Sequence, residues 1–256
     1  MALAEAVEEV ALEAREALAR ARQRTTPLVL ARDRSLPVLE ALLPLLPDGL
    51  RRGSTVAVDG GPGATTLALA LAVAASAAGS WTAVVGAPSL GLRAAGELGV
   101  APERLLVVPE PPRESWATVV AALVDSVELV LVAAGRVAPG EVRRLTARCR
   151  ERDAVLVTLP RSSWPGPDVR LTVGASSWTG PVGGGAGRLE ARRAEVVAGG
   201  RGAAARERRA TLWLPDRDGR VSEASDVGSA SGWAPGALPE DGSGAQPQRS
   251  RVAVHP

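Results

Sequence analysis

The chain contains no lysine, asparagine, isoleucine, phenylalanine or tyrosine, and it has one cysteine and one histidine among its 256 residues. Apart from His255, every basic side chain is an arginine. The single cysteine, Cys149, excludes an internal disulfide framework and fits a reducing compartment. So few nucleophilic or metal-binding groups leave little basis for covalent or metal catalysis. The absence of lysine excludes every mechanism that needs a lysine side chain.

The chain is mildly basic, with a formal net charge of +2 and a pI of about 9.7. Because arginine replaces lysine throughout, its abundance indicates nucleic-acid binding only weakly. The longest apolar run, residues 67–78, is shorter than the about 20 residues that span a bilayer. The first residues are rich in glutamate and arginine and lack the apolar core of a signal peptide. We therefore expect a soluble, cytoplasmic protein.

Apolar segments typical of buried strands alternate with helix-forming segments through the middle of the chain. Strands are predicted at 54–58, 82–87, 104–109, 127–134 and 154–159, and helices at 65–78, 92–98, 115–124 and 140–152. This alternation predicts an α/β fold whose mainly parallel central sheet is covered by helices on both faces. Three later strand-like stretches, at 168–173, 188–200 and 208–215, predict an antiparallel extension of that sheet.

The composition divides the chain into three parts. Residues 1–34 predict an amphipathic N-terminal helix and a linker, and the helix is either an ordinary packed terminal helix or an arm that docks on a partner. Residues 35–215 form the predicted core, which begins with a short apolar helix interrupted by Pro44 and Pro47. Residues 216–256 are rich in glycine, serine and proline and predict a disordered tail.

The stretch VDGGPGATTLALALA is similar to a phosphate-binding loop, G-x-x-x-x-G-K-[ST], placed between a strand and a helix. Glycine N–H groups at a helix N-terminus can hold an anion, so weak nucleotide or anion binding stays open although no cofactor is expected. The alternative is a tight strand-to-helix turn without a ligand. The candidate binding residues of this vestigial loop are Gly60, Gly61, Gly63, Thr65 and Thr66.

The loop departs from the pattern at the positions that carry its chemistry. Ala64 stands where the lysine belongs, and no other residue of the chain can supply that lysine. Val58 stands at the first glycine position. Asp59 follows it and adds a negative charge where phosphate would bind.

The order of the elements and their local sequences resemble the RecA core over most of residues 46–219. The stretches DGLRRGSTVAV, AAGELGVAPERLLVVPEP, ALVDSVELVLV and RRAEVVAGGRGAAARERRATLWL carry this resemblance. A closer likeness is to the actinobacterial ImuA-type proteins, in LRRGSTVAV, GATTLALAL, LGLRAAGELGV and WPGPDVRLTV. The resemblance implies a RecA-like P-loop core. It also implies an accessory role in the inducible-mutagenesis response to DNA damage, beside a Y-family-like ImuB-type protein and an error-prone DnaE-type polymerase.

The RecA resemblance identifies two further positions of the ATPase site. Ala133 stands where RecA has the aspartate that directs Mg²⁺, and Pro88 stands where it has the glutamate that activates water. Together with Ala64, these are three independent losses at the positions that hydrolysis needs. The sequence therefore predicts a protein that does not hydrolyse ATP and is not an enzyme.

Two loops correspond to those with which RecA holds single-stranded DNA. The first, residues 134–141, is short, whereas the second, residues 159–168, contains Arg161 and Trp164. An arginine and an aromatic ring of this kind can contact the backbone of single-stranded DNA and stack on a base; alternatively, Trp164 caps the sheet edge. The following arginines form either a basic face or ordinary solubilising charge: Arg188, Arg192, Arg193, Arg201, Arg206, Arg208 and Arg209.

Together, the residues and the resemblance favour a non-catalytic scaffold of an error-prone translesion-synthesis complex in the SOS response. Expected partners are the ImuB-type protein, the DnaE-type polymerase and RecA, with nucleoid association when DNA is damaged. Three alternatives stay open: a SulA-like cell-division inhibitor, a divergent ATPase whose missing groups come from a partner, and a single-stranded DNA-binding protein.

Overall fold

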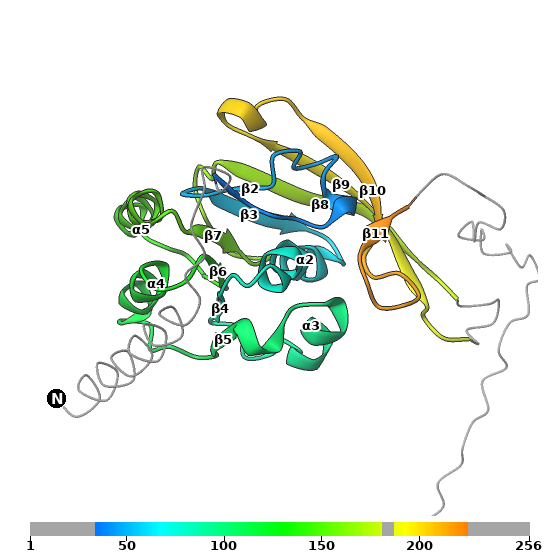
Figure 1. Ribbon diagram of the computed structural model, residues 1–256, viewed down its shortest axis with the longest axis horizontal. Coiled ribbons are helices and arrows are strands. Elements are labelled where there is room, and N and C mark those ends of the chain that lie inside the picture. Colours follow the sequence, from blue (N-terminus) through cyan, green and yellow to red (C-terminus); the bar gives the residue numbers. More distant parts are fainter. Residues whose placement is uncertain (1–33, 181–186, 225–256) are drawn as a thin grey trace, which may run out of the picture. The chain divides into compact units, whose positions relative to one another are not determined.

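The computed structural model describes residues 34–180 and 187–224, which belong to one compact unit (Figure 1). The predicted N-terminal helix lies outside the described residues, as does the tail after Ala224. Both therefore stay predictions. Among the described residues, none of the helices is both long and apolar enough to cross a membrane.

A nine-stranded sheet runs through the described part of the chain, in the order β11-β10-β9-β8-β3-β7-β6-β4-β5. The six strands from β8 to β5 are parallel to one another, and β9, β10 and β11 extend the sheet in antiparallel pairing. The strands are β3 (Thr55–Gly60), β4 (Thr82–Val85), β5 (Leu105–Val108), β6 (Leu129–Val132), β7 (Val155–Thr158), β8 (Val169–Thr179), β9 (Ala191–Gly200), β10 (Arg208–Trp213) and β11 (Ser222–Glu223).

Helices cover both faces of this sheet (Figure 1). They are α2 (Ala64–Ala77), α3 (Leu92–Leu98), α4 (Trp116–Val124) and α5 (Pro139–Arg152). Successive side chains of a strand point to opposite faces. Leu129 and Leu131 of β6 belong to the apolar cluster that holds the buried sides of α2 and α3. Val130 and Val132 belong to the cluster of α4 and α5. The predicted α/β class, with a mainly parallel sheet covered on both faces, is confirmed.

The segment before β3 folds differently from the predicted apolar helix. It forms two short antiparallel strands, β1 (Ser35–Leu36) and β2 (Leu50–Arg51), with a 3₁₀ turn, η1 (Glu40–Leu42), between them. Pro44 and Pro47 lack the N–H groups that a longer helix needs. Five leucines of the segment are buried in the cluster of α2, whereas Leu43 is exposed; the buried ones are Leu36, Leu42, Leu45, Leu46 and Leu50.

The sheet continues beyond residue 215, where the disordered tail was predicted to begin. The Asp216 carboxylate accepts hydrogen bonds from the backbone N–H groups of Asp218 and Arg220, at 3.0 and 2.9 Å. This turn brings β11 alongside β10, and Val221 and Ala224 are buried there. The folded part therefore extends to Ala224, because one aspartate organises a segment whose composition resembles a loop.

Candidate functional site

The vestigial phosphate loop joins β3 to α2 and lies against β8. A β-carbon on Gly60, whose φ is 107°, would lie 2.1 Å from the carbonyl oxygen of Val173. The N–H of Gly61 donates to that same oxygen at 3.0 Å. Gly63 caps α2 in the left-handed region, with a φ of 109°. Gly60 and Gly63 are therefore required by the backbone itself, and one N–H of the loop is already occupied by the neighbouring strand.

The position of the missing lysine is part of the hydrophobic core. Ala64 is 2% exposed and packs in the same apolar cluster as Leu67 of α2. Thr65 is exposed and Thr66 is half-buried. The two threonines of the loop thus lie at or near the surface. The loop itself contributes no cationic side chain.

A cation reaches the loop from a distant part of the chain. A β-carbon on Gly63 would lie 3.2 Å from Nη1 of Arg192, which belongs to β9. The Arg192 guanidinium stacks on the Trp178 ring at 4.4 Å, and its buried Nε has no hydrogen-bond partner among the described residues. Burial lowers the pKa of Arg192, but an arginine remains charged at neutral pH. One positive charge therefore stands beside the start of α2, which the sequence alone did not predict.

The negative charge at the mouth of the loop is neutralised. Asp59 forms an ion pair with Arg170 of β8. The strands β3 and β8 are adjacent and parallel in this region, with Asp59 opposite Thr172. The repulsion expected from Asp59 is therefore reduced by a neighbour whose position depends on the strand order.

The position at which RecA binds Mg²⁺ contains only backbone and small side chains. Ala133 directly follows β6, and its N–H donates to the carbonyl of Val85 at 2.8 Å. A β-carbon on Gly86, with its φ of 75°, would lie 2.6 Å from the carbonyl oxygen of Ala133. Across the described residues, no group of three or more histidine, cysteine, aspartate or glutamate side chains could hold a metal ion. These strand ends offer no carboxylate for a metal.

The predicted DNA-contacting pair is not available as a stacking platform. Trp164 is 3% exposed and packs in the cluster of α4 and α5, so its ring cannot stack on a base. Arg161 is exposed. The N–H of Ser163 donates to the carbonyl of Gly135 at 3.1 Å, and the two loops are paired there. Of the two alternatives for Trp164, its burial argues against base stacking and agrees with a structural role, because the loop sequence folds back onto the core.

The seven arginines between residues 188 and 209 do not form one face. In the antiparallel pairing of β9 and β10, Arg193 lies opposite Trp213, and Arg208 lies opposite Ala198. Arg192 and Arg193 are thus at one end of β9, and Arg201 follows its other end. Of these seven, Arg201 and Arg208 belong to a larger basic surface.

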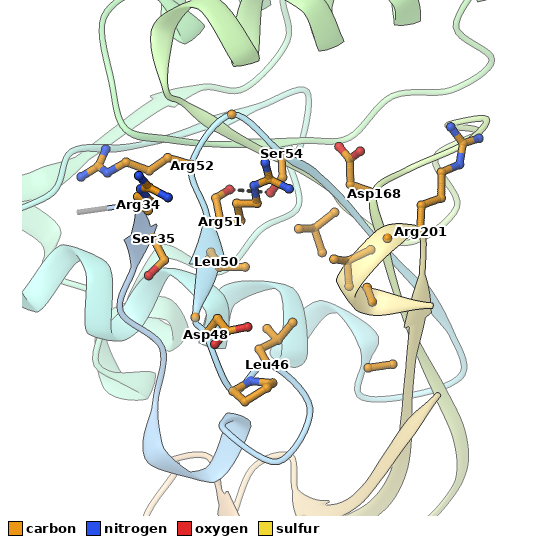
Figure 2. A pocket seen from close by; sticks show the side chains of 18 of the residues that line it. Arg34, Ser35, Leu46, Asp48, Leu50, Arg51, Arg52, Ser54, Asp168 and Arg201 are labelled. Carbon is orange, nitrogen blue, oxygen red and sulfur yellow. Dashed lines mark hydrogen bonds between the residues drawn. The ribbon is translucent and has the colours of Figure 1, made fainter. Parts of the chain in front are cut away.

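That surface is a groove at the N-terminal ends of β3, β7 and β8, on the edge of the sheet opposite the phosphate loop (Figure 2). Its volume is about 860 Å³. We call it the arginine groove, and the arginines that line it are Arg34, Arg51, Arg52, Arg150, Arg201 and Arg208. Three aspartates also line it: Asp48, Asp153 and Asp168.

Part of the chain is similar in sequence to a known family and to a mycobacterial protein. Residues 44–166 match the family described as the MT3502 N-terminal domain. Over 132 residues, the chain is 34% identical to the uncharacterized protein Rv3395c of Mycobacterium tuberculosis, a match that covers 51% of this chain and 62% of that protein.

The crystal structure of the RadB recombinase superposes with a TM-score of 0.51 at 14% identity, over 77% of this chain and all of that one. At this identity the likeness concerns the fold. None of the three descriptions states an ImuA-type role, which therefore stays a prediction. The strand order, the loop between β3 and α2 and this superposition give the chain a RecA-like fold.

Proposed function

We propose that this protein is a non-catalytic RecA-like accessory protein that acts as a scaffold in an error-prone translesion-synthesis complex. The observation that supports the non-catalytic part is the environment of Ala64 and Ala133. The first is buried in the core, and the second is in close backbone contact with Gly86. These two positions of the RecA site, which should bear reacting charges, are thus occupied by uncharged groups packed in or against the core.

The residues around the loop favour weak anion binding over hydrolysis. Phosphoryl transfer depends on a metal ion and on charges placed around the transferred group. Arg192 supplies one positive charge near Gly63, which resembles part of a phosphate site. No carboxylate stands at the end of β6 to hold Mg²⁺, and Pro88 cannot orient water. Arg192 can therefore contribute to weak anion binding, whereas the residues at the end of β6 would not hold the metal ion that turnover needs.

The partners follow from the ImuA-type resemblance: the ImuB-type protein, the DnaE-type polymerase and RecA, met in the cytoplasm and at the damaged nucleoid. We assign the docking to the segments that flank the described core, residues 1–24 and residues 225–256. A RecA-like core without turnover gives such segments a stable platform.

A pull-down from damage-treated cells tests the scaffold role. Three tagged proteins are compared: the full chain, a chain that lacks residues 1–24, and a chain that ends at Ala224, after β11. We expect the full chain to recover the ImuB-type protein or the polymerase, and one truncation to lose it. Recovery of the cell-division protein FtsZ instead, with inhibition of its polymerisation, would contradict the proposal.

A further inference from the structure

The arginine groove brings together positive charges from segments that are far apart in the sequence. Arg34 and Arg51 come from the β1–β2 unit, Arg150 from the end of α5, and Arg201 and Arg208 from the β9–β10 connection. Figure 2 shows Arg34, Arg51 and Arg52 on one side of the groove and Arg201 on the other, with Asp168 between them.

The aspartates of the groove compensate only part of this charge. Asp168 accepts hydrogen bonds from the Thr55 N–H and hydroxyl, each at 2.9 Å, and its other oxygen lies 3.5 Å from Arg150. Within the described residues, no ion pair involves Arg34, Arg51, Arg201 or Arg208. Six arginines against three aspartates leave an excess of three positive charges in one groove.

One of these arginines also carries an unsatisfied donor. The buried Nε of Arg52 has no hydrogen-bond partner among the described residues. A buried N–H without a partner is costly, and a cluster of like charges is too. An anion in the groove would relieve the repulsion among its arginines.

We propose that the arginine groove binds the sugar-phosphate backbone of nucleic acid without reading its sequence. The arginine guanidinium matches phosphate with two parallel hydrogen bonds, and several such groups along an open groove fit a chain of phosphates. No aromatic residue lines the groove, so base stacking does not contribute. Both single-stranded and duplex DNA are therefore ligands, held mainly by charge.

An acidic peptide is the competing ligand, and the lining disfavours it. Peptide docking draws most of its energy from apolar or aromatic side chains that enter exposed pockets. Leu45, Leu46, Leu50 and Val56 line the groove, but each is 6% exposed or less. These four side chains therefore offer a peptide almost no accessible surface.

This site does not include Arg161, Trp164 or the loop at residues 134–141, although Asp168, the last residue of the loop at 159–168, lines the groove. DNA binding by the groove is also independent of the scaffold role, and it can be tested on the purified protein without any partner. A failure to bind DNA therefore leaves the pull-down result untouched, and the reverse also holds.

The test is a fluorescence anisotropy titration of labelled mixed-sequence DNA of about 20 nucleotides, single-stranded and duplex, between about 50 and about 200 mM salt. The groove variant is Arg51→Ala/Arg201→Ala, in which both side chains are exposed and unpaired among the described residues. The control is Arg113→Ala/Arg143→Ala, which removes the same charge from exposed positions outside the groove. A third protein, Arg51→Lys/Arg201→Lys, keeps the charge.

We expect wild-type binding to weaken steeply with salt. The groove variant should bind about tenfold more weakly, and the slope of log K against log salt should fall by about 1 for each lost phosphate contact. The control should stay within about twofold of wild type, and the lysine variant should bind more weakly than wild type but more tightly than the alanine variant, because it keeps the charge and loses the paired hydrogen bonds. Equal losses in the groove variant and the control would overturn the proposal. So would the absence of DNA binding, or binding of a polyglutamate peptide in place of DNA.

Discussion

Gly60→Ala is the sharpest test of why the glycine loop exists. We infer that Gly60 serves the junction of β3 and β8 rather than a phosphate. A β-carbon there would lie 2.1 Å from the carbonyl oxygen of Val173 and 2.7 Å from its nitrogen. The side chain would also have to accept a φ of 107°.

The two costs add. A left-handed backbone conformation costs an L-residue about 1–2 kcal/mol. Forcing extra volume against a packed backbone costs about 1–3 kcal/mol. The free energy of unfolding should therefore fall by about 3 kcal/mol, a large part of the 5–15 kcal/mol typical of a folded domain.

Gly61→Ala is the matched control in the same loop. Its β-carbon would lie 3.6 Å from the nearest atom, an ordinary contact, and its φ is not positive. We expect a change within about 1 kcal/mol. The assay is equilibrium urea unfolding of both variants, followed by circular dichroism. Equal stabilities of the two variants, with a loss of phosphate or nucleotide binding in Gly60→Ala, would refute this account of the loop.

Three further predictions concern groups in the core and on α5. Burial raises the pKa of Cys149 to about 12, so a thiol reagent at pH 8 should label it only after urea is added; rapid labelling of the native protein would contradict its burial. Hydrogen bonds from Arg148 hold the pKa of Asp125 below its usual value, so this pair stabilises the fold above about pH 4, and the stability is lost as the pH falls through the folded-state pKa. Asp125→Asn should cost about 0.5–1 kcal/mol at pH 7 and flatten the acid limb of stability, whereas an unchanged acid limb would contradict the pairing. Trp164→Ala should cost about 3–5 kcal/mol in thermal unfolding, and a cost below about 1 kcal/mol would show that the ring is not in the core.

The parallel sheet could be predicted because its signal is local. The strands are short runs of valine and leucine, and the helices between them have their own apolar positions, so α3 has its predicted bounds of Leu92–Leu98. The segment around η1 does not form the predicted helix, because most of its leucines pack in a core built from elements distant in the sequence. Pro44 and Pro47 already weakened the helix there.

The site was harder to predict because it depends on contacts between distant residues. The glycine loop is visible in the sequence, but the role of Gly60 depends on Val173, and the cation beside Gly63 comes from Arg192. Likewise, the arginine groove assembles residues that span positions 34 to 208. The burial of Trp164 also depends on packing that a single loop sequence does not reveal.

ATP turnover by the purified full-length protein tests the central claim most directly. It is measured with Mg²⁺ and saturating ATP, alone, with single-stranded DNA, and with the ImuB-type protein. The matched variant is Thr65→Val, which removes the hydroxyl at the start of α2 from an exposed position. The account predicts that wild type and variant show the same background rate in all conditions. Turnover that a partner or DNA stimulates, and that Thr65→Val abolishes, would contradict it.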